Sequence, residues 1–233
     1  MTSADEYVYE VIDNEKDARV CAQLIADEFV QNNPLLVFEQ LPAQTFHDGF
    51  VWPALQGVLD ERLSFLARHC LSSEIVGAIV ASDLYVMREK HPFNYSDPPA
   101  FTPVVDLIDE MNHLFLCQDF DQKLKANMVL CIGTGATRAQ HSRKGVGGQL
   151  RAMVCEHARK TKGFQYAVVQ TAHPGTHHIY LKKLGGKEMT INDLTKWIWK
   201  KKGNGSCPYI NFKGEPMPNI MVKLTSDRNP PLV

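Results

Sequence analysis

The sequence lacks any long hydrophobic run. No stretch of the 233 residues approaches the ~18 uncharged apolar residues that a membrane-spanning helix needs. The first ten residues carry Asp5 and Glu6 and have no basic cluster ahead of an apolar segment, so they do not resemble a secretory signal. We therefore expect a cytoplasmic protein with no membrane partner.

An excess of charge of one sign is lacking as well. The chain has 25 Lys and Arg against 26 Asp and Glu, which gives a formal net charge of −1. Such a chain has no overall attraction to nucleic acid or to an anionic membrane, and neither is expected as a partner. Any anion site must be built locally from a few residues. The sequence leaves the oligomeric state open between a monomer and a homodimer.

Paired cysteines are also missing. The six cysteines are scattered and none forms a C-x-x-C pair, which argues against a structural zinc site and against a disulfide framework. Reduced thiols in the cytosol are the simpler interpretation. The six are Cys21, Cys70, Cys117, Cys131, Cys155 and Cys207.

What the chain does have is ordinary globular composition, 44% hydrophobic and 22% charged, over a length that suits one large domain at 1–233. Hydrophobic periodicity and turn residues predict a mixed fold of α/β (α+β) type. Asp13 is the expected N-cap of the first helix, and residues 87–103, with four prolines, are expected to form an exposed insertion loop. Strands are predicted near 7–12, 64–69, 75–86, 128–137, 164–171, 187–191, 195–200 and 219–224. Helices are predicted near 13–31, 43–62 (with a break or kink near Pro53), 104–122, 145–162 and 176–184.

The central feature is a strand, a polar loop and a glycine turn that opens a helix, with Ser142–Leu150 at its centre. A helix N-terminus has unpaired N–H groups and a partial positive charge, and glycines let a ligand approach that backbone closely. Arg143 and Lys144 add charge at the same place. Together these features predict a pyrophosphate site.

Two common nucleotide motifs are excluded. The Walker A pattern G-x-x-x-x-G-K-[ST] does not occur. The dinucleotide pattern G-x-G-x-x-G fails after Gly133-x-Gly135, where Arg138 follows, and after Gly145-x-Gly147, where Leu150 follows. ATP and NAD therefore become less favoured ligands.

Ser142-Arg-Lys-Gly145-Val-Gly147 resembles motif A of the GNAT superfamily of N-acetyltransferases, Q/R-x-x-G-x-G/A, with Ser142 at the irregular first position. The predicted order of strands and helices is similar to that of the family. So is the Lys183-Leu-Gly185 end of the late helix. The resemblance implies a central, mostly antiparallel sheet of about seven strands that splays between its fourth and fifth strands.

The chain further resembles insect-type arylalkylamine N-acetyltransferases in two places. Phe29-Val-Gln-Asn-Asn-Pro34-Leu35 is similar to their F-x-x-D-E-P-L stretch, and the segment from Tyr209 to Pro216 is similar to their C-terminal end. Asn33 stands where that group has the glutamate proposed as general base.

The resemblance implies acetyl-CoA as the donor and a direct attack of an amine on the thioester through a tetrahedral intermediate. A strand N–H in the splay would polarise the thioester carbonyl. No metal is expected. The residues implied to bind the donor are Ala136, Thr137, Arg138, Ser142, Arg143, Lys144, Gly145, Val146, Gly147 and Gly148.

Amine attack needs one proton removed from the ammonium and one given to the leaving thiolate. His177 and then His173, at the start of the helix after the fifth strand, are the first candidates for the base, because histidine titrates near neutral pH. Tyr180 is the candidate acid, although many family members have this tyrosine one position later, where Leu181 stands. Glu28, near the end of the first helix, is a further candidate base.

The acceptor pocket is expected to be aromatic and apolar, which suits an arylalkylamine or another small amine. A protein or peptide N-acetyltransferase and a non-catalytic acyl-CoA-binding module are the alternatives. The expected substrate-binding residues are Phe29, Asn33, Leu36, Phe38, Phe46 and Tyr209.

Overall fold

The computed structural model describes residues 6–224. Its centre is a seven-stranded sheet with the order β1-β2-β3-β4-β5-β7-β6. All neighbouring strands are antiparallel except β4 and β5, which are parallel. The strands are β1 Tyr7–Val11, β2 Phe65–His69, β3 Ile75–Asp83, β4 Val129–Thr137, β5 Tyr166–Gln170, β6 Lys187–Asn192 and β7 Met217–Lys223.

Most of the helices that the apolar periodicity predicted are present. The N-cap of α1 is Asn14 rather than Asp13, because the Asn14 side chain accepts the N–H of Asp17. The predicted 43–62 helix is interrupted by a π-helical turn directly ahead of Pro53, a residue that cannot donate to a regular helix. The helices are α1 Glu15–Asn32, α2 Pro34–Glu39, α3 Ala43–Phe46, α4 Trp52–Val58, α5 Leu84–Lys90, α6 Pro103–Leu114, α7 Val146–Lys162 and α8 Pro174–His178.

Two predictions of extended structure were wrong. The strand predicted to Val86 stops at Asp83, whose side chain accepts the Tyr85 N–H and starts α5. The helix α5 therefore takes up the first part of the predicted insertion loop. Residues 195–200 form no strand, because Asp193 caps a short 3-10 turn there and the chain then runs through Trp197 and Trp199.

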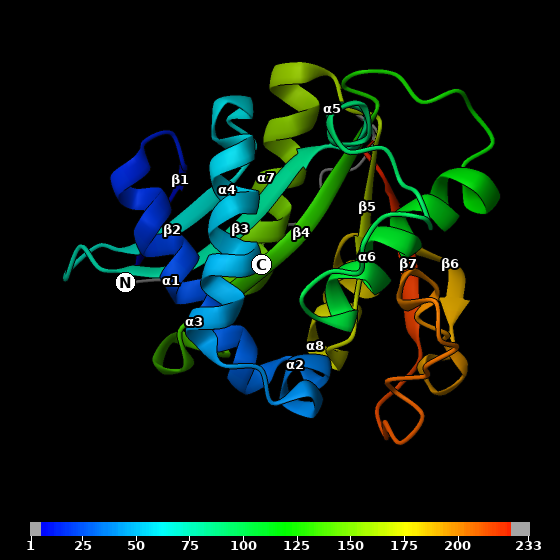
Figure 1. The fold of residues 1–233 in the computed structure, drawn as a ribbon. Coiled ribbons are helices and arrows are strands. Elements are labelled where there is room, and N and C mark those ends of the chain that lie inside the picture. The colour runs from blue at the N-terminus through cyan, green and yellow to red at the C-terminus, as the bar shows by residue number, and fades with distance from the viewer. Residues whose placement is uncertain (1–5, 225–233) are drawn as a thin grey trace.

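The sheet carries helices on both faces (Figure 1). One core lies between the sheet and the helices α1, α2, α3, α4 and α6, and it contains Ile25, Phe46 and Leu107. The other core lies between the sheet and α7, where Val146, Leu150, Val154 and Ala158 form the predicted apolar stripe. Burying both faces of the sheet explains why every residue of β3 is buried.

The parallel pair β4 and β5 separates part of the way along. Their pairing runs from Val129–Tyr166 to Ile132–Val169 and goes no further. Beyond that point β4 pairs with β3 up to Thr137, while β5 pairs with β7. The predicted splay between strands 4 and 5 is therefore present, and the backbone groups along its two edges are available to a ligand.

No helix among residues 6–224 is long and apolar enough to cross a membrane. All six cysteines are free thiols in the structure.

Candidate functional site

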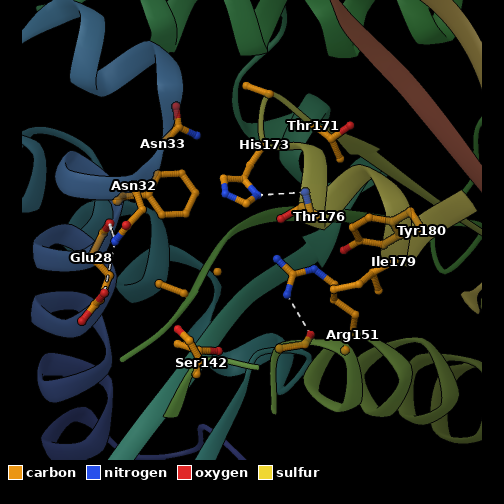
Figure 2. A pocket seen from close by; sticks show the side chains of 18 of the residues that line it. Glu28, Asn32, Asn33, Ser142, Arg151, Thr171, His173, Thr176, Ile179 and Tyr180 are labelled. Atoms are coloured by element: carbon orange, nitrogen blue, oxygen red, sulfur yellow. Dashed lines mark hydrogen bonds between the residues drawn. The ribbon is translucent and has the colours of Figure 1, made fainter. Parts of the chain in front are cut away.

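A cavity of about 560 Å³ occupies the gap between β4 and β5 (Figure 2). Its walls come from the end of α1, the splayed half of β4, the first turn of α7, the end of β5, and α8 with the π-helical turn that follows it. These elements are far apart in the sequence, and the sheet order brings them together at one end of the central strands.

The floor of the cavity near α7 is a main-chain cradle. Gly145 has φ of +85° and Arg143 has φ of +62°, so the loop folds back on itself just before the helix. Gly145 is the N-cap of α7, and no side chain caps this terminus, which leaves first-turn N–H groups for a ligand. A 17-residue helix with a side-chain-free N-terminus suits an anionic group such as a pyrophosphate.

The charges beside this cradle differ in their availability. Arg143 is exposed and lines the cavity. Lys144 does not line it, because its Nζ donates to Glu6 Oε1 at 2.9 Å, an interaction that raises the pKa of Lys144 and lowers that of Glu6. Arg138 is held by Glu74 at 2.9 Å and by the carbonyl of Ile75.

Most of the residues predicted to bind the donor line the cavity, and Arg138, Lys144 and Val146 do not. Val146 is 1% exposed and packs in the core under α7, because the apolar stripe of the helix begins with it. Those that line the cavity are Ala136, Thr137, Ser142, Arg143, Gly145, Gly147 and Gly148.

A bulge in β4 marks the other end of the cavity. Ile79 of β3 faces Gly135, whereas Ala81 faces Ile132, so β4 contains one extra residue at Gly133–Thr134. A bulge leaves an extra residue outside the regular ladder, and Gly133 of this segment lines the gap between β4 and β5. An amide of this segment is the candidate donor to a thioester carbonyl oxygen.

Tyr180 and Arg151 form the wall between α8 and α7 (Figure 2). Tyr180 is 1% exposed, and its Oη has no hydrogen-bond partner among the described residues. Burial raises the pKa of its hydroxyl, and the charge of Arg151 opposes that rise. A π-helical turn over Ile179–Lys183 carries Tyr180, so this residue rather than Leu181 reaches the cavity.

The histidines of α8 separate into two positions. His173 lines the cavity and caps α8, its Nδ1 accepting the Gly175 N–H at 3.1 Å. His177, predicted as the first base, does not line the cavity, because its Nε2 pairs with Glu188 of β6 at 2.8 Å. His173 precedes α8 as its extended N-cap residue, whereas His177 lies within the helix, so the two side chains start from different backbone conformations.

The end of α1 contributes a carboxylate and two amides (Figure 2). Glu28 lines the cavity; its two carboxylate oxygens accept the Ala139 N–H at 3.3 Å and the Asn32 amide at 3.2 Å. Asn33 also lines the cavity, but its Oδ1 accepts the N–H groups of Leu35 and Leu36 and so caps α2. Among the described residues that line the cavity, Glu28 carries the only carboxylate.

A second, smaller cavity of about 80 Å³ continues from the first and is mostly apolar. The two share lining residues at their junction, including Phe29, Asn33, Gly133 and Gln170. The rings of Phe29, Phe46 and Phe50 stack in series along its wall, with centroids 6.0 and 5.5 Å apart. The predicted substrate-binding residues Phe29, Asn33, Leu36 and Phe46 all line this pocket.

Phe38 and Tyr209, also predicted to bind substrate, line neither cavity. Their rings contact each other instead, 6.0 Å apart. Tyr209 is fully buried and its hydroxyl donates to Glu39, which also accepts from Thr102 and from the Val104 N–H. This cluster joins α2 to the start of α6 and to the loop before β7.

Arg151 and Thr171 line the cavity and were not predicted as site residues. Arg151 follows Gly147 by four positions, so both lie on the helix face that meets the cavity. That spacing was the available signal for Arg151. Nothing in the sequence distinguishes Thr171 from the other residues that end a buried strand.

Among residues 6–224, no three His, Cys, Asp or Glu side chains come together in a way that could hold a metal ion. The expectation that no metal takes part stays a prediction.

The seven-stranded sheet, flanked by helices and splayed between its parallel strands β4 and β5, has the fold of the GNAT N-acetyltransferases that the resemblance implied. No protein-family model and no curated protein matches the chain by sequence. The solved structures do match. The C-terminal condensation domain of Ebony, in complex with beta-alanyl-dopamine, gives a TM-score of 0.73 at 14% identity, over 94% of this chain and 98% of that one.

Two insect enzymes show the same likeness. A putative arylalkylamine N-acetyltransferase 7 from the yellow fever mosquito Aedes aegypti has a TM-score of 0.69 at 11% identity, covering 94% of this chain and 88% of that one. The Drosophila melanogaster polyamine N-acetyltransferase, which forms N-acetylagmatine, has a TM-score of 0.68 at 14% identity, covering 94% and 100%. At these identities the likeness establishes the fold.

Proposed function

We propose that this chain is an acetyl-CoA-dependent N-acetyltransferase that acts on the primary amine of a small, largely apolar molecule such as an arylalkylamine. The observation that carries the proposal is the continuity of the two cavities. One runs from the uncapped N-terminus of α7 to the β4 bulge, and an aromatic pocket begins at that end. A donor and an acceptor could therefore meet at Gly133–Thr134.

The donor half supports acetyl-CoA through its backbone. The helix N-terminus and Arg143 suit a pyrophosphate, and the free edges of β4 and β5 suit the amides of a pantetheine arm. A cavity of about 560 Å³ is in the size range of small-molecule sites.

The acceptor half supports an apolar amine. No acidic residue lines the small pocket in the part of the chain that the structure describes. Stacked aromatic walls favour a ring over a polyamine, which would need carboxylates along its length. The names of the insect relatives cover both arylalkylamines and a polyamine, and this lining favours the first class.

Two residues are proposed to move the protons. Glu28 takes the proton from the ammonium through a water, because it is the only carboxylate lining either cavity among the described residues. Tyr180 gives its hydroxyl proton to the leaving sulfur. In its neutral form His173 accepts at Nδ1, so its proton lies on Nε2 and it offers a donor there, which suits holding a ligand better than removing a proton.

The test is thiol release from acetyl-CoA across a panel of arylalkylamines, agmatine and a short peptide. We expect turnover to be fastest with an arylalkylamine. Tyr180→Phe and Glu28→Gln should each lower kcat by about 100-fold, the usual effect of losing a general acid or base. Tyr85→Phe and Asp27→Asn, which alter residues that line neither cavity, serve as matched controls.

Three outcomes would contradict the proposal. Faster acetylation of the peptide than of any free amine would make the chain a peptide acetyltransferase. CoA binding without turnover of any amine would make it a non-catalytic module. Full activity in Tyr180→Phe and Glu28→Gln would leave the chemistry to other groups.

A cytoplasmic location is part of the proposal, and the six free cysteines support it, because thiols stay reduced in the cytoplasm. Fractionation of cells that express the tagged protein would check this location.

A further inference from the structure

Arg151 is a buried cation without an acidic partner. Its side chain comes from the second turn of α7 and the residue is 8% exposed. Its Nη1 donates to the Gly147 carbonyl at 2.7 Å, its Nε has no partner, and it forms no ion pair with any residue in 6–224. Buried charges in proteins are normally paired, so this arrangement needs an explanation.

The Tyr180 side chain lies beside that charge on the cavity wall. The guanidinium carbon of Arg151 lies 5.7 Å from the centroid of the Tyr180 ring, and the Tyr180 hydroxyl has no hydrogen-bond partner among the described residues. A buried tyrosine hydroxyl usually has a partner. The Arg151 side chain also holds the pKa of the Tyr180 hydroxyl down against the effect of burial. A buried cation beside a buried hydroxyl, each with one unpartnered polar atom and both lining one cavity, indicates a site arranged for charge that develops only during a reaction (Figure 2).

The other titratable groups close to Tyr180 carry no charge. Cys155 of α7 and Cys131 of β4 are buried, and burial raises the pKa of Cys155 to about 12 and that of Cys131 to about 11. Both are therefore neutral thiols at physiological pH. Arg151 is the charge that acts on the Tyr180 hydroxyl.

We propose that Arg151 is a positioning residue that stabilises the negative charge formed on the sulfur and the Tyr180 oxygen as the thioester breaks. This inference rests on the proposed function, because it assigns a role within the same transfer. It explains why a residue that points into the cavity from the helix carrying the phosphate cradle is a long cation rather than an aliphatic side chain.

The step balances as follows. The amine nitrogen forms a bond to the acetyl carbon, and the carbon–sulfur bond breaks with its electron pair going to sulfur. Sulfur takes the proton from the Tyr180 Oη, and the phenolate that remains faces the guanidinium of Arg151. The phenolate then regains a proton by way of water from the proton released by the amine, so one proton moves in net from nitrogen to sulfur.

Arg151→Leu tests the role, with Arg151→Lys as the charge-conserving variant. Arg159→Leu, on the same helix but away from both cavities, is the matched control. We expect Arg151→Leu to lower kcat by about 30-fold or more while the KM for acetyl-CoA changes less than threefold, an effect confined to the transition state. Arg151→Lys should recover part of the lost kcat. In a protein that already carries Tyr180→Phe, Arg151→Leu should lower kcat little further.

A second readout does not depend on turnover. The thiol of CoA bound to the protein is titrated by its thiolate absorbance, and it should ionise at lower pH in the wild-type protein than in Arg151→Leu. Calorimetry of CoA binding gives the affinity of each variant, and thermal unfolding shows that each is folded. If Arg151→Leu does not fold, Arg151→Met, which keeps the length of the side chain, takes its place.

Two results would overturn the inference. A rise in the KM and Kd of the donor with unchanged kcat would show that Arg151 binds the donor in its ground state. A wild-type preference for succinyl-CoA that Arg151→Leu reverses would assign the charge to an acyl carboxylate. A third result would separate the two proposals. If the wild-type protein turns over no amine, yet the pKa of its bound CoA thiol is lower than in Arg151→Leu, the proposed function is contradicted while the effect of Arg151 beside Tyr180 stands.

Discussion

The larger cavity, where we propose that the donor binds, contains a cradle of backbone and glycines next to α7, whereas the smaller, acceptor pocket is lined mostly by apolar side chains. Gly133, Gly135, Gly145, Gly147 and Gly148 all belong to the donor cavity. The acceptor pocket is bounded by aromatic and aliphatic side chains from α1, α2, the π-helical turn after α3, and α6. Only the junction of the two halves is shared.

This difference separates what each half can recognise. A backbone cradle binds groups that are the same in every donor molecule, and a pyrophosphate requires little more than N–H groups and a helix N-terminus. A pocket of packed side chains changes its shape with each substitution, so acceptor preference can vary while the donor stays fixed. Substitutions in the two halves should therefore change different kinetic constants.

The strongest test of the comparison fills the backbone cradle. A Cβ on Gly147 would lie 3.3 Å from Arg151 Nη1 and 3.4 Å from Thr137 Oγ1, so a valine there occupies donor space. We expect Gly147→Val to lower kcat/KM for acetyl-CoA by about 1,000-fold or more, equivalent to about 4 kcal/mol. Gly57→Val is the matched control, because Gly57 is an exposed helical glycine with open space around it. Normal donor kinetics in Gly147→Val would place the pyrophosphate elsewhere.

The acceptor half is tested by a milder change. Phe46→Leu removes ring area from the stacked aromatic wall, and we expect the KM for an arylalkylamine to rise about tenfold, the usual cost of losing one to two kcal/mol of apolar contact. The KM for acetyl-CoA should stay constant. Phe38→Leu is the control, since Phe38 is 38% exposed and lines neither cavity. Equal effects of the two substitutions would refute the acceptor pocket as we define it.

Adjacent basic residues of the loop make a finer test. Arg143 faces the cavity, while Lys144 is paired with Glu6. Arg143→Ala should raise the KM for acetyl-CoA about fivefold and make it less sensitive to salt, because an exposed charge contributes through a screened interaction. Lys144→Ala should change it less than twofold. The reverse order would mean that Lys144 leaves Glu6 when the donor binds.

The smallest kinetic effect is expected outside both halves. Tyr209→Phe removes a donor from the half-buried Glu39, which should lower the free energy of unfolding by about 1–3 kcal/mol with little change in KM for either substrate. Burial already raises the pKa of Glu39 above its ordinary 4.5, so the stability it contributes falls as pH rises through that raised value. Without the Tyr209 hydroxyl the pKa of Glu39 rises further, because that hydrogen bond lowers it. The decrease in the free energy of unfolding caused by Tyr209→Phe should therefore be larger at pH 7 than at pH 4. Thermal unfolding at the two pH values measures this, and an increase in the amine KM would return Tyr209 to the acceptor site.

The parts of the fold that were predicted well are those that depend on local signals. The helix over Val146–Lys162 begins after Gly145 and ends at Gly163, both in the left-handed conformation that glycine allows. The end of β3 was missed because Leu84-Tyr-Val-Met87 has the residue types of a strand. The Asp83 cap and the contacts of α5 with the sheet decided otherwise.

The sequence by itself determined the backbone of the turn before α7, where we propose that the donor binds. A glycine turn after a strand fixes the backbone of the cradle through φ values that few other residues adopt, and this requires no distant contact. Only the tertiary structure decided which side chains face the reaction. The ion pair of His177 with Glu188, the cap that His173 places on α8, and the burial of Tyr209 against Glu39 all depend on partners remote in the chain. So does the position of Arg151 beside Tyr180, because the order of the strands brings α7 and α8 to the two sides of one gap.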